Sequence, residues 1–542
     1  KSRNTTLDGV IHFADYNNYR YSNITVKGRL DKKLFDGVAT IADDNAGLTL
    51  NGIINFNSKT PTFDLLADIK KLNLKNLNLS KDSITFKGKL NIDFTGTTID
   101  NFLGTAKITD GELTKDGKQL PFDFLSLSSA YADSVKTLTA SSNEFEGAIT
   151  GNFNINDLPD AFQLFLTKYY PSYINPPNGF PENESFHFDI TTKFVEDYIK
   201  LLDTSITGFN YSHLYGDLNS GSNSINLHAN VPQFKYKLYN FDDVKLLAKG
   251  NFDSLSVTGE ARNININDSL NIPLTSFKIN SRNDSSKVSI YTGANQKVQK
   301  ADLNALLLSY NDGVKIKFDP STFTINTKTW SIDETGVLVF RSRNPSSGEL
   351  ILREGEQKIM LKTQPSANGN WNDLKVELTK INIGDFSPFF LPRNRLEGLV
   401  SGNILAEDMT HDLKITSNDI QTEFLRLDND SLGEIKASLV YDNIIKELKV
   451  KGNTLNQENY LGFDADLFFA DPVKSKNNII ALKARSFQIK ILERFLGNLF
   501  SDMEGFLTGD INLKGEFDEL SITGKGRLKD AGLKVNFTKC FY

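Results

Sequence analysis

The chain has 542 residues, a formal net charge of −6 and a single cysteine, Cys540. The acidic balance argues against a nucleic-acid partner, because such proteins usually carry a basic footprint. One cysteine excludes an internal disulfide and any cysteine-based metal cluster. Hydrophobic residues make up 39% of the chain, including 39 Phe, so a large apolar surface is available.

Residues 1–156 predict short strands in which apolar and polar side chains alternate. The clearest case is Leu90, Ile92 and Phe94, which alternate with Asn91 and Asp93. Successive side chains of a strand leave opposite faces, so a period of two predicts a half-buried strand. We therefore expect this first segment to be a sheet with one apolar face.

Residues 157–204 predict an insertion rich in helix and proline. Apolar residues between Asp157 and Tyr170 follow helical spacing, with Asp157 as the N-cap and Pro159 in the first turn. The helix should end before the proline-rich loop Pro171–Pro181, and a second short helix is expected at Val195–Leu202.

Residues 205–380 return to the strand pattern. Phe234–Tyr239 and Thr322–Lys328 each alternate as one strand would, and Leu255 and Val257 mark another apolar face. A β repeat is expected over residues 381–484, with an apolar lead-in at Phe386–Leu391 and with Leu413 and Ile415 on its apolar face.

Residues 485–542 predict a second such repeat, led by a helix over Ile489–Phe500 and truncated at its end. The alternation between Glu504 and Phe537 places one set of apolar residues on a common face: Ile511, Leu513, Leu520, Ile522, Leu533, Val535 and Phe537. The chain begins and ends inside strand-like sequence, so we expect an internal fragment, with an anchor or terminal domain outside it.

Several stretches recur along the chain. Lys514–Gly524 (KGEFDELSITG) matches Lys249–Gly259 (KGNFDSLSVTG) at eight of eleven positions, and Glu504–Gly509 resembles Glu397–Gly402 and Glu146–Gly151. The spacing is irregular, so the pattern predicts a degenerate repeat in which each unit contacts its neighbours.

An apolar sheet face must be covered, and this chain offers few helices to cover it. Three coverings are open: the sheet closes into a barrel, it folds onto itself as a sealed sandwich, or it leaves an apolar trough for a ligand. We expect an all-β, elongated repeat, a long U-shaped and mostly antiparallel sheet with a few short amphipathic helices at its edge or inside.

No enzyme, cofactor or metal site is predicted. The histidines His12, His187, His213, His228 and His411 show no metal-ligand spacing, and no catalytic motif occurs. Acidic stretches at Asp43–Gly47 and Asp428–Asp430 lack a complete calcium-loop spacing and are typical of turns. Three glutamates before glycine, Glu146, Glu397 and Glu504, either contact lipid headgroups at a groove edge or simply solvate strand starts.

The ordered combination of an apolar lead-in, a glutamate-glycine box and alternating strands resembles the TamB family of the AsmA-like group. The residues that carry it are Phe487–Phe500, Glu504–Gly509, Lys514–Phe537, and the earlier Ile381–Phe390 followed by Glu397–Gly402. The resemblance implies a trough that moves phospholipids between the inner and outer membranes, a periplasmic location in a Gram-negative bacterium, an inner-membrane anchor outside this chain and a BamA-related outer-membrane partner.

We therefore expect a periplasm-spanning conduit that supports outer-membrane biogenesis. A structural or adhesive β-repeat scaffold and an outer-membrane protein assembly factor without lipid cargo are the alternatives. The residues predicted to line the lipid groove are Leu90, Ile92, Phe94, Leu255, Val257, Leu413, Ile415, Ile511, Leu513, Leu520, Ile522, Leu533, Val535 and Phe537.

Overall fold

The structure is a computed structural model. It describes residues 4–179, 183–266, 270–293, 298–344, 346–367, 371–387, 395–409, 412–428, 430–456, 458–468, 474–493, 497, 499–516 and 521–542. The chain divides into two compact units, one formed by Lys1–Asn267 with Pro273–Asn283 and the other by Asp268–Ile272 with Asp284–Tyr542.

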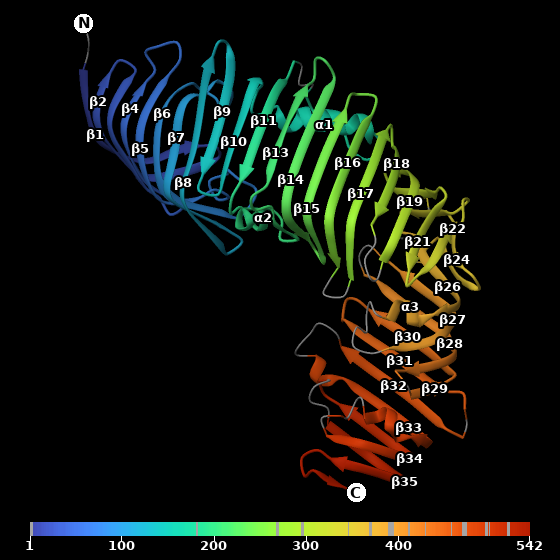
Figure 1. Ribbon diagram of the computed structural model, residues 1–542. Coiled ribbons are helices and arrows are strands. Elements are labelled where there is room, and N and C mark those ends of the chain that lie inside the picture. Colours follow the sequence, from blue (N-terminus) through green and yellow to red (C-terminus); the bar gives the residue numbers. More distant parts are fainter. Residues whose placement is uncertain are drawn as a thin grey trace. The chain divides into compact units, whose positions relative to one another are not determined.

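The prediction of an all-β fold with a long antiparallel sheet and few short helices is confirmed (Figure 1). The described residues form 36 strands of one sheet. Most neighbours in the sheet are also neighbours in the sequence, because alternating strands of this length join most simply by short hairpins. The first and last strands, β1 and β36, do not pair with each other in the described parts of the chain.

The first unit contains sixteen complete strands and part of β17 (Leu270–Arg282). The complete strands are β1 (Asn4–Tyr16), β2 (Tyr19–Asp31), β3 (Leu34–Ala42), β4 (Ala46–Asn55), β5 (Thr62–Asn73), β6 (Ile84–Thr95), β7 (Leu103–Lys115), β8 (Lys118–Ala132), β9 (Val135–Ser142), β10 (Phe145–Asn152), β11 (Ser185–Thr192), β12 (Ile206–Gly208), β13 (His213–Asn219), β14 (Ser224–Tyr236), β15 (Tyr239–Gly250) and β16 (Leu255–Ile266).

The second unit contains the remaining strands. They are β18 (Ser285–Thr292), β19 (Val298–Tyr310), β20 (Gly313–Phe318), β21 (Ser321–Ile325), β22 (Lys328–Ile332), β23 (Val337–Arg341), β24 (Gly348–Glu354), β25 (Gln357–Gln364), β26 (Asp373–Asn382), β27 (Leu396–Glu407), β28 (Lys414–Leu427), β29 (Asp430–Gly433), β30 (Ile435–Asp442), β31 (Glu447–Thr454), β32 (Tyr460–Phe468), β33 (Ile479–Gln488), β34 (Phe500–Lys514), β35 (Ser521–Val535) and β36 (Cys540–Phe541).

The helices are short. Those described are α1 (Leu158–Tyr169), α2 (Glu196–Leu202), α3 (Ile383–Phe386) and the 3₁₀ turns η1 (Ile99–Asn101), η3 (Ser475–Asn477) and η4 (Ile489–Leu492). The two helices predicted at Asp157–Tyr170 and Val195–Leu202 are confirmed as α1 and α2. Between them lies strand β11, which the prediction of a helix- and proline-rich insertion missed.

The helix predicted over Ile489–Phe500 is wrong in its extent. Its first turn is the 3₁₀ segment η4, and Phe500 already belongs to β34. Residues 494–496 and 498 lie outside the described residues, as does most of the lead-in predicted at Phe386–Leu391. Ile489 and Leu492 are buried together with Leu513 of β34, so this turn packs on the sheet.

Two stretches predicted as single strands are hairpins instead. β14 ends at Tyr236 and β15 begins at Tyr239, and the intervening Lys237 has a positive φ of 53°. β21 and β22 turn in the same way between Ile325 and Lys328. Alternation continues through a two-residue turn, so the pattern alone cannot separate one strand from two.

The internal repeat is confirmed at the level of strand register. In the Lys249–Gly259 stretch Lys249 pairs with Ser256, and in Lys514–Gly524 the equivalent Lys514 pairs with Ser521. The hairpin of β27 and β28 pairs Glu407 with Lys414, which is the same register again after the shift of 107 positions. Similar sequence therefore builds the same hairpin each time.

Candidate functional site

The inner face of the first unit is defined by Ile92 and Phe94 of β6. Residues directly opposite each other on adjacent strands project from the same face of a sheet. Following these pairs from strand to strand therefore traces a row of side chains that share the face. Such rows run across the strands and show what a ligand lying along the sheet would meet.

One row passes through Phe94 and reaches Val257, both predicted groove residues. We call it the Phe94 row, and it consists of Leu30, Phe35, Ile54, Phe63, Phe94, Gly104, Ser129, Leu138, Ile149, Phe188, Gly216, Leu227, Ala248 and Val257. On β1 the row continues to Thr5, so its polar side chains are Thr5 and Ser129. Leu255 lies two residues before Val257 on β16 and therefore on the same face.

The adjacent row passes through Ile92 and has no polar side chain. We call it the Ile92 row, and it consists of Leu7, Gly28, Gly37, Gly52, Leu65, Ile92, Ala106, Leu127, Ala140, Gly147, Ile190, Leu214, Ala229, Leu246 and Gly259. Leu90 lies two residues before Ile92 on β6. Five of the predicted residues thus sit in or beside two largely apolar rows, which extend as far as β16.

Exposure follows the same alternation. Leu65, Ala67 and Ile69 of β5 are all less than 10% exposed, whereas Leu66 between them is 56% exposed. On β6 the predicted residues Leu90, Ile92 and Phe94 are half-buried, and Asn91 and Asp93 are exposed. The inner face is thus partly shielded, and apolar surface on it still meets solvent.

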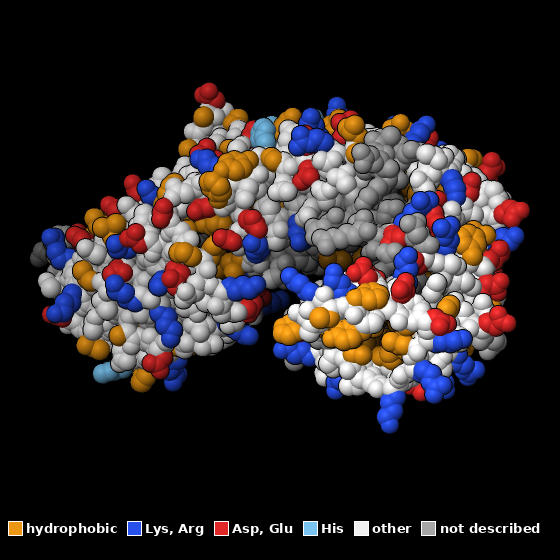
Figure 2. Space-filling model, turned by 60° about the horizontal axis from the view of Figure 1, so that its bottom comes forward, with side chains coloured by type: hydrophobic (Ala, Val, Ile, Leu, Met, Phe, Trp, Pro, Cys, Tyr) orange, Lys and Arg blue, Asp and Glu red, His pale blue; other side chains and the backbone are white. Residues whose placement is uncertain are grey.

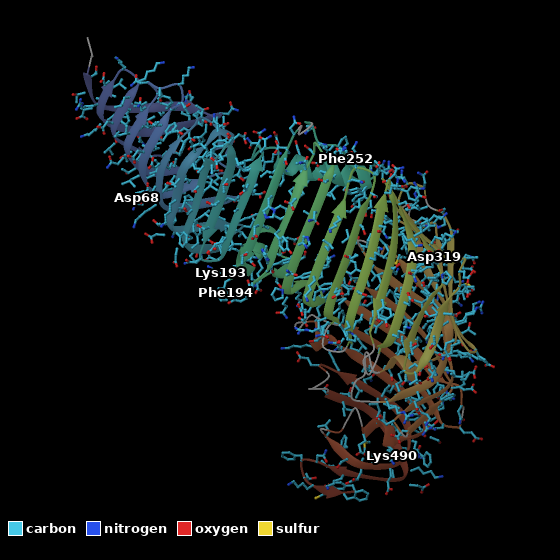
Figure 3. All side chains as sticks on the ribbon, turned by 45° about the horizontal axis from the view of Figure 1, so that its top comes forward. Asp68, Lys193, Phe194, Phe252, Asp319 and Lys490 are labelled. Atoms are coloured by element: carbon cyan, nitrogen blue, oxygen red, sulfur yellow. The ribbon has the colours of Figure 1, made fainter. Side chains whose placement is uncertain are left out.

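Helix α1 covers part of this face. Ala161, Phe165 and Tyr169 are almost fully buried against Phe186 and Leu218 of the sheet. Phe165 also packs on Phe252, with ring centroids 4.9 Å apart, at the edge of the sheet where β15 turns into β16 (Figure 3). Lys193 and Phe194, which precede α2, lie at the opposite edge (Figure 3).

The second unit has an equivalent inner face, defined by Ile511 and Leu513 of β34. The row through Ile511 consists of Ile420, Ala437, Gly452, Phe463, Leu482, Ile511 and Gly524. The row through Leu513 consists of Ser417, Leu439, Val450, Ala465, Ile480, Leu513 and Ile522. Ile415 lies two residues before Ser417, so it joins the same face.

An apolar cavity of about 330 Å³ opens on this inner face. Its lining comes from β28 to β34 and from η4, and comprises Leu425, Leu427, Leu432, Ile435, Thr454, Leu461, Phe463, Ala465, Ile480, Leu482, Leu492, Ile511 and Leu513. Thr454 is the one polar residue, and its hydroxyl is already used: it accepts the Leu461 N–H at 2.9 Å and donates to the Asn459 carbonyl at 3.2 Å. Hydrophobic side chains gather at the end of this unit where β34 and β35 lie (Figure 2).

A larger and shallower hollow of about 700 Å³ lies on the other, polar face of the same strands. Lys451 and Asp464 form an ion pair there at 3.3 Å, and Asn512 lies nearby in the lining. The smaller cavity is the better candidate for the predicted chemistry, because a hydrocarbon ligand needs an apolar wall and no hydrogen-bonding group.

The other predicted residues divide into three groups. Leu533 packs with the buried cluster around Leu513, and Val535 pairs with Phe500 at the end of β35. Leu413 precedes β28, and its carbonyl accepts the Asn443 N–H at 3.0 Å. Leu520 lies outside the described residues.

The placement of Phe537 in a strand is wrong. Strand β35 ends at Val535, and Phe537 follows in a turn with its side chain 96% exposed. Lys539 in the same turn has a positive φ of 54°, which fits a tight reversal into β36. The turn ends the alternation that predicted an inward position for Phe537.

The three box glutamates lie on strands and face charged groups or solvent. Glu146 pairs with Lys193 at 3.2 Å, and Glu397 pairs with Arg395 at 2.5 Å. Glu504 is exposed opposite Gly532. These are the contacts of surface carboxylates, and a headgroup contact at these positions stays a prediction.

Three histidines of the first unit share its outer face. His187 lies 2.9 Å from Asp217, His213 lies 3.0 Å from Asp189, and His228 stacks on Tyr215 at 4.6 Å between ring centroids. Within the described ranges no group of three or more His, Cys, Asp or Glu side chains could hold a metal ion. His411 is not among the described residues.

Several inner-face residues were missed from the sequence. Leu461, Phe463, Ala465, Ile480 and Leu482 line the cavity, and the alternation in β32 and β33 could have identified them. Leu138, Ile149 and Phe188 were missed as well, because cross-strand register is not visible in the sequence.

No protein-family model, curated protein or solved structure matches the chain. In the portion that the structure describes, no helix is both long and apolar enough to cross a membrane.

Proposed function

We propose that the chain shields the acyl chains of phospholipids along the inner faces of its sheet, as one segment of a periplasmic bridge between the inner and outer membranes. The observation that carries the proposal is the Ile92 row, which crosses the first unit without a polar side chain. The apolar cavity of the second unit supports it, because all of its polar capacity is already satisfied.

The energetics suit a surface of this kind. Each buried methylene is worth about 0.8 kcal/mol, so a 16-carbon chain exposed to water costs roughly 12 kcal/mol. Hydrophobic burial is non-directional. Leu, Ile, Val and Phe side chains at similar density along a face therefore allow a chain to move without a large barrier, and no fixed ligand geometry is needed.

The resemblance of the repeats to the TamB family adds the cellular setting. It implies a Gram-negative periplasm, an inner-membrane anchor outside this chain, a BamA-related outer-membrane partner and a role in outer-membrane biogenesis. The repeated stretches form hairpins of the same register, which agrees with an array of similar sequence repeats. These cellular assignments rest on the resemblance.

Site-specific photo-crosslinking to radiolabelled phosphatidylethanolamine tests the proposal. A photo-reactive residue at Ile480 or Ile511 faces the cavity, whereas Ala481 and Asn512 are the matched positions on the other face of the same strands. We expect lipid capture at the first pair to exceed capture at the second several-fold. Equal capture on both faces would remove the basis of the proposal.

A sealed structural scaffold is the second candidate function, and one region favours it. Ile332, Leu338 and Leu350 form a buried cluster in the second unit, and Trp330 nearby is fully buried between Phe323 and Phe386. This part of the chain fills its own core. A scaffold predicts that the protein purified from cells carries no phospholipid by mass spectrometry, and a conduit predicts bound phospholipid.

A further inference from the structure

Helix α1 covers one strip of the inner face of the first unit, whereas side chains elsewhere on that face are more exposed. Beneath it, Phe186 is 4% exposed and Leu218 is 1% exposed. On the same inner face, away from α1, Leu90 and Ile92 remain half-buried. The Phe94 row itself continues under the helix through Ile149, Phe188 and Leu227.

The helix is attached in a way that leaves the sheet independent of it. Strands β10 and β11 flank the insertion, and its two ends, Asn152 and Ser185, pair directly with each other. Displacing α1 therefore breaks no strand pairing. The base of the insertion is held separately, because the buried Glu184 carboxylate accepts the Asn154 N–H at 3.1 Å and Asn152 donates its side-chain amide to the Asn183 carbonyl at 3.0 Å.

The apolar contacts that bury α1 on the sheet are those that an acyl chain could replace. One polar contact also holds the helix, a 2.7 Å hydrogen bond between the hydroxyls of Tyr170, the C-cap residue of α1, and Ser281 of β17. The helix packs Ala161, Phe165 and Tyr169 against the sheet, Leu164 is also buried, and the opposite side carries Leu166, which is 42% exposed. Hydrophobic contact is non-directional, so hydrocarbon can take the place of these side chains at little cost in specificity.

One feature weakens the docked position. The Tyr169 hydroxyl is buried and has no hydrogen-bond partner among the described residues. Burial also raises the pKa of this phenol, so it stays neutral. A buried donor without a partner loses its hydration and gains nothing in return, which disfavours the state in which α1 lies on the sheet.

We infer that the strip of inner face beneath α1 is an acyl-chain site and that α1 is its removable lid. When α1 is docked, it covers the Phe94 row between Leu138 and Leu227, so an acyl chain cannot reach these side chains. When α1 is displaced, the side chains of the row are accessible along its whole length. The inference rests on the proposed function, because α1 and an acyl chain compete for the same side chains.

Three substitutions on α1, made in the full chain, test the inference that α1 is a removable lid. Tyr169→Phe removes the unpaired hydroxyl and should favour the docked lid, whereas Phe165→Asp places a charge against the sheet and should release it. Leu166→Asp carries the same charge on the exposed side of the helix and is the matched control. Proteolysis within 157–179 reports whether α1 is docked.

Photo-reactive residues at Phe188, under α1, and at Ile92, on the open face, report lipid capture from vesicles containing radiolabelled phosphatidylethanolamine. We expect Phe165→Asp to raise capture at Phe188 to the level at Ile92, and Tyr169→Phe to lower it roughly fivefold. Leu166→Asp should change neither. Capture at Ile92 should be the same in all variants.

Two results would overturn the lid. One is that Phe165→Asp makes α1 protease-sensitive without raising capture at Phe188. The other is that Tyr169→Phe protects α1 from protease and leaves capture unchanged. Absence of capture at both Phe188 and Ile92 would instead contradict the proposed function, so the two failures are distinguishable.

Discussion

Phe94 and Val257 belong to one row of directly paired residues and are joined across ten strands of the first unit, although they lie far apart in the sequence. Each step of the row is a cross-strand pair, so side chains along it keep to one face. The apolar side chains of successive strands therefore form a track that runs perpendicular to the strands.

A charge in the cavity of the second unit should block lipid binding. Leu482→Arg places a guanidinium against the apolar lining contributed by Phe463 and Ile511, where it has no partner. We expect the phospholipid that copurifies with the protein, measured by mass spectrometry, to fall several-fold. Ala481→Arg, one residue earlier on the polar face, is the control and should retain lipid. Equal loss in both variants would show that the cavity is not the binding surface.

Stability should distinguish a buried ring from an exposed one. Phe487 is 2% exposed in the cluster around Leu513, so Phe487→Ala should lower the free energy of unfolding by about 3–5 kcal/mol. Phe537→Ser should change it by less than about 0.5 kcal/mol, because the Phe537 side chain is 96% exposed in a turn. Urea titration checks both. A large loss for Phe537→Ser would restore its predicted inward position.

Two glycines of β35 should respond differently to alanine. Gly524 has a φ of +151°, and a Cβ there would come 2.2 Å from the backbone oxygen of Asp510. Gly526 lacks that constraint, and its Cβ would meet a Leu507 methyl group that can move. We expect Gly524→Ala to destabilise the second unit by more than about 1 kcal/mol and Gly526→Ala by less. Thermal unfolding of the two variants tests this order.

Acid should weaken the second unit through Asp312. The Arg341 guanidinium, 2.6 Å from the Asp312 carboxylate, holds the pKa of that carboxyl below its usual value, against the opposing effect of burial. The unfolded chain then binds the proton more readily than the folded chain. The contribution of Asp312 to the free energy of unfolding is therefore complete above about pH 4 and is lost as the pH falls through the lowered pKa of the folded state.

Asp312→Asn should therefore lower the unfolding temperature at neutral pH and reduce its further fall in acid. Scanning calorimetry between about pH 6 and pH 2 measures both effects. If the variant and the parent lost the same number of degrees over that range, the acid sensitivity would come from other carboxylates.

Much of the fold could be predicted because its signals are local. Alternation identified β6, β34 and β35, and helical spacing with a proline in the first turn identified α1. Repeated sequence predicted repeated structure, and the shared register of Lys249 with Ser256 and Lys514 with Ser521 confirms it.

What the sequence did not predict depends on tertiary contacts. Two-residue turns keep the alternation intact, so the hairpin at Lys237 appeared as one strand. Ile489 and Leu492 of η4 pack with Leu513, and Phe500, whose spacing suited the same helix, belongs to β34 instead. The covering of Phe186 and Leu218 by α1 joins residues that no local pattern relates.

The most direct test of the central claim is a photo-crosslinking scan of every position from Leu90 to Thr95 in the full chain, with labelled phosphatidylethanolamine in vesicles. If the inner face shields acyl chains, capture will alternate, high at Leu90, Ile92 and Phe94 and low at Asn91 and Asp93. Capture that is uniform along the strand, or greater at Asn91 and Asp93, would contradict the account.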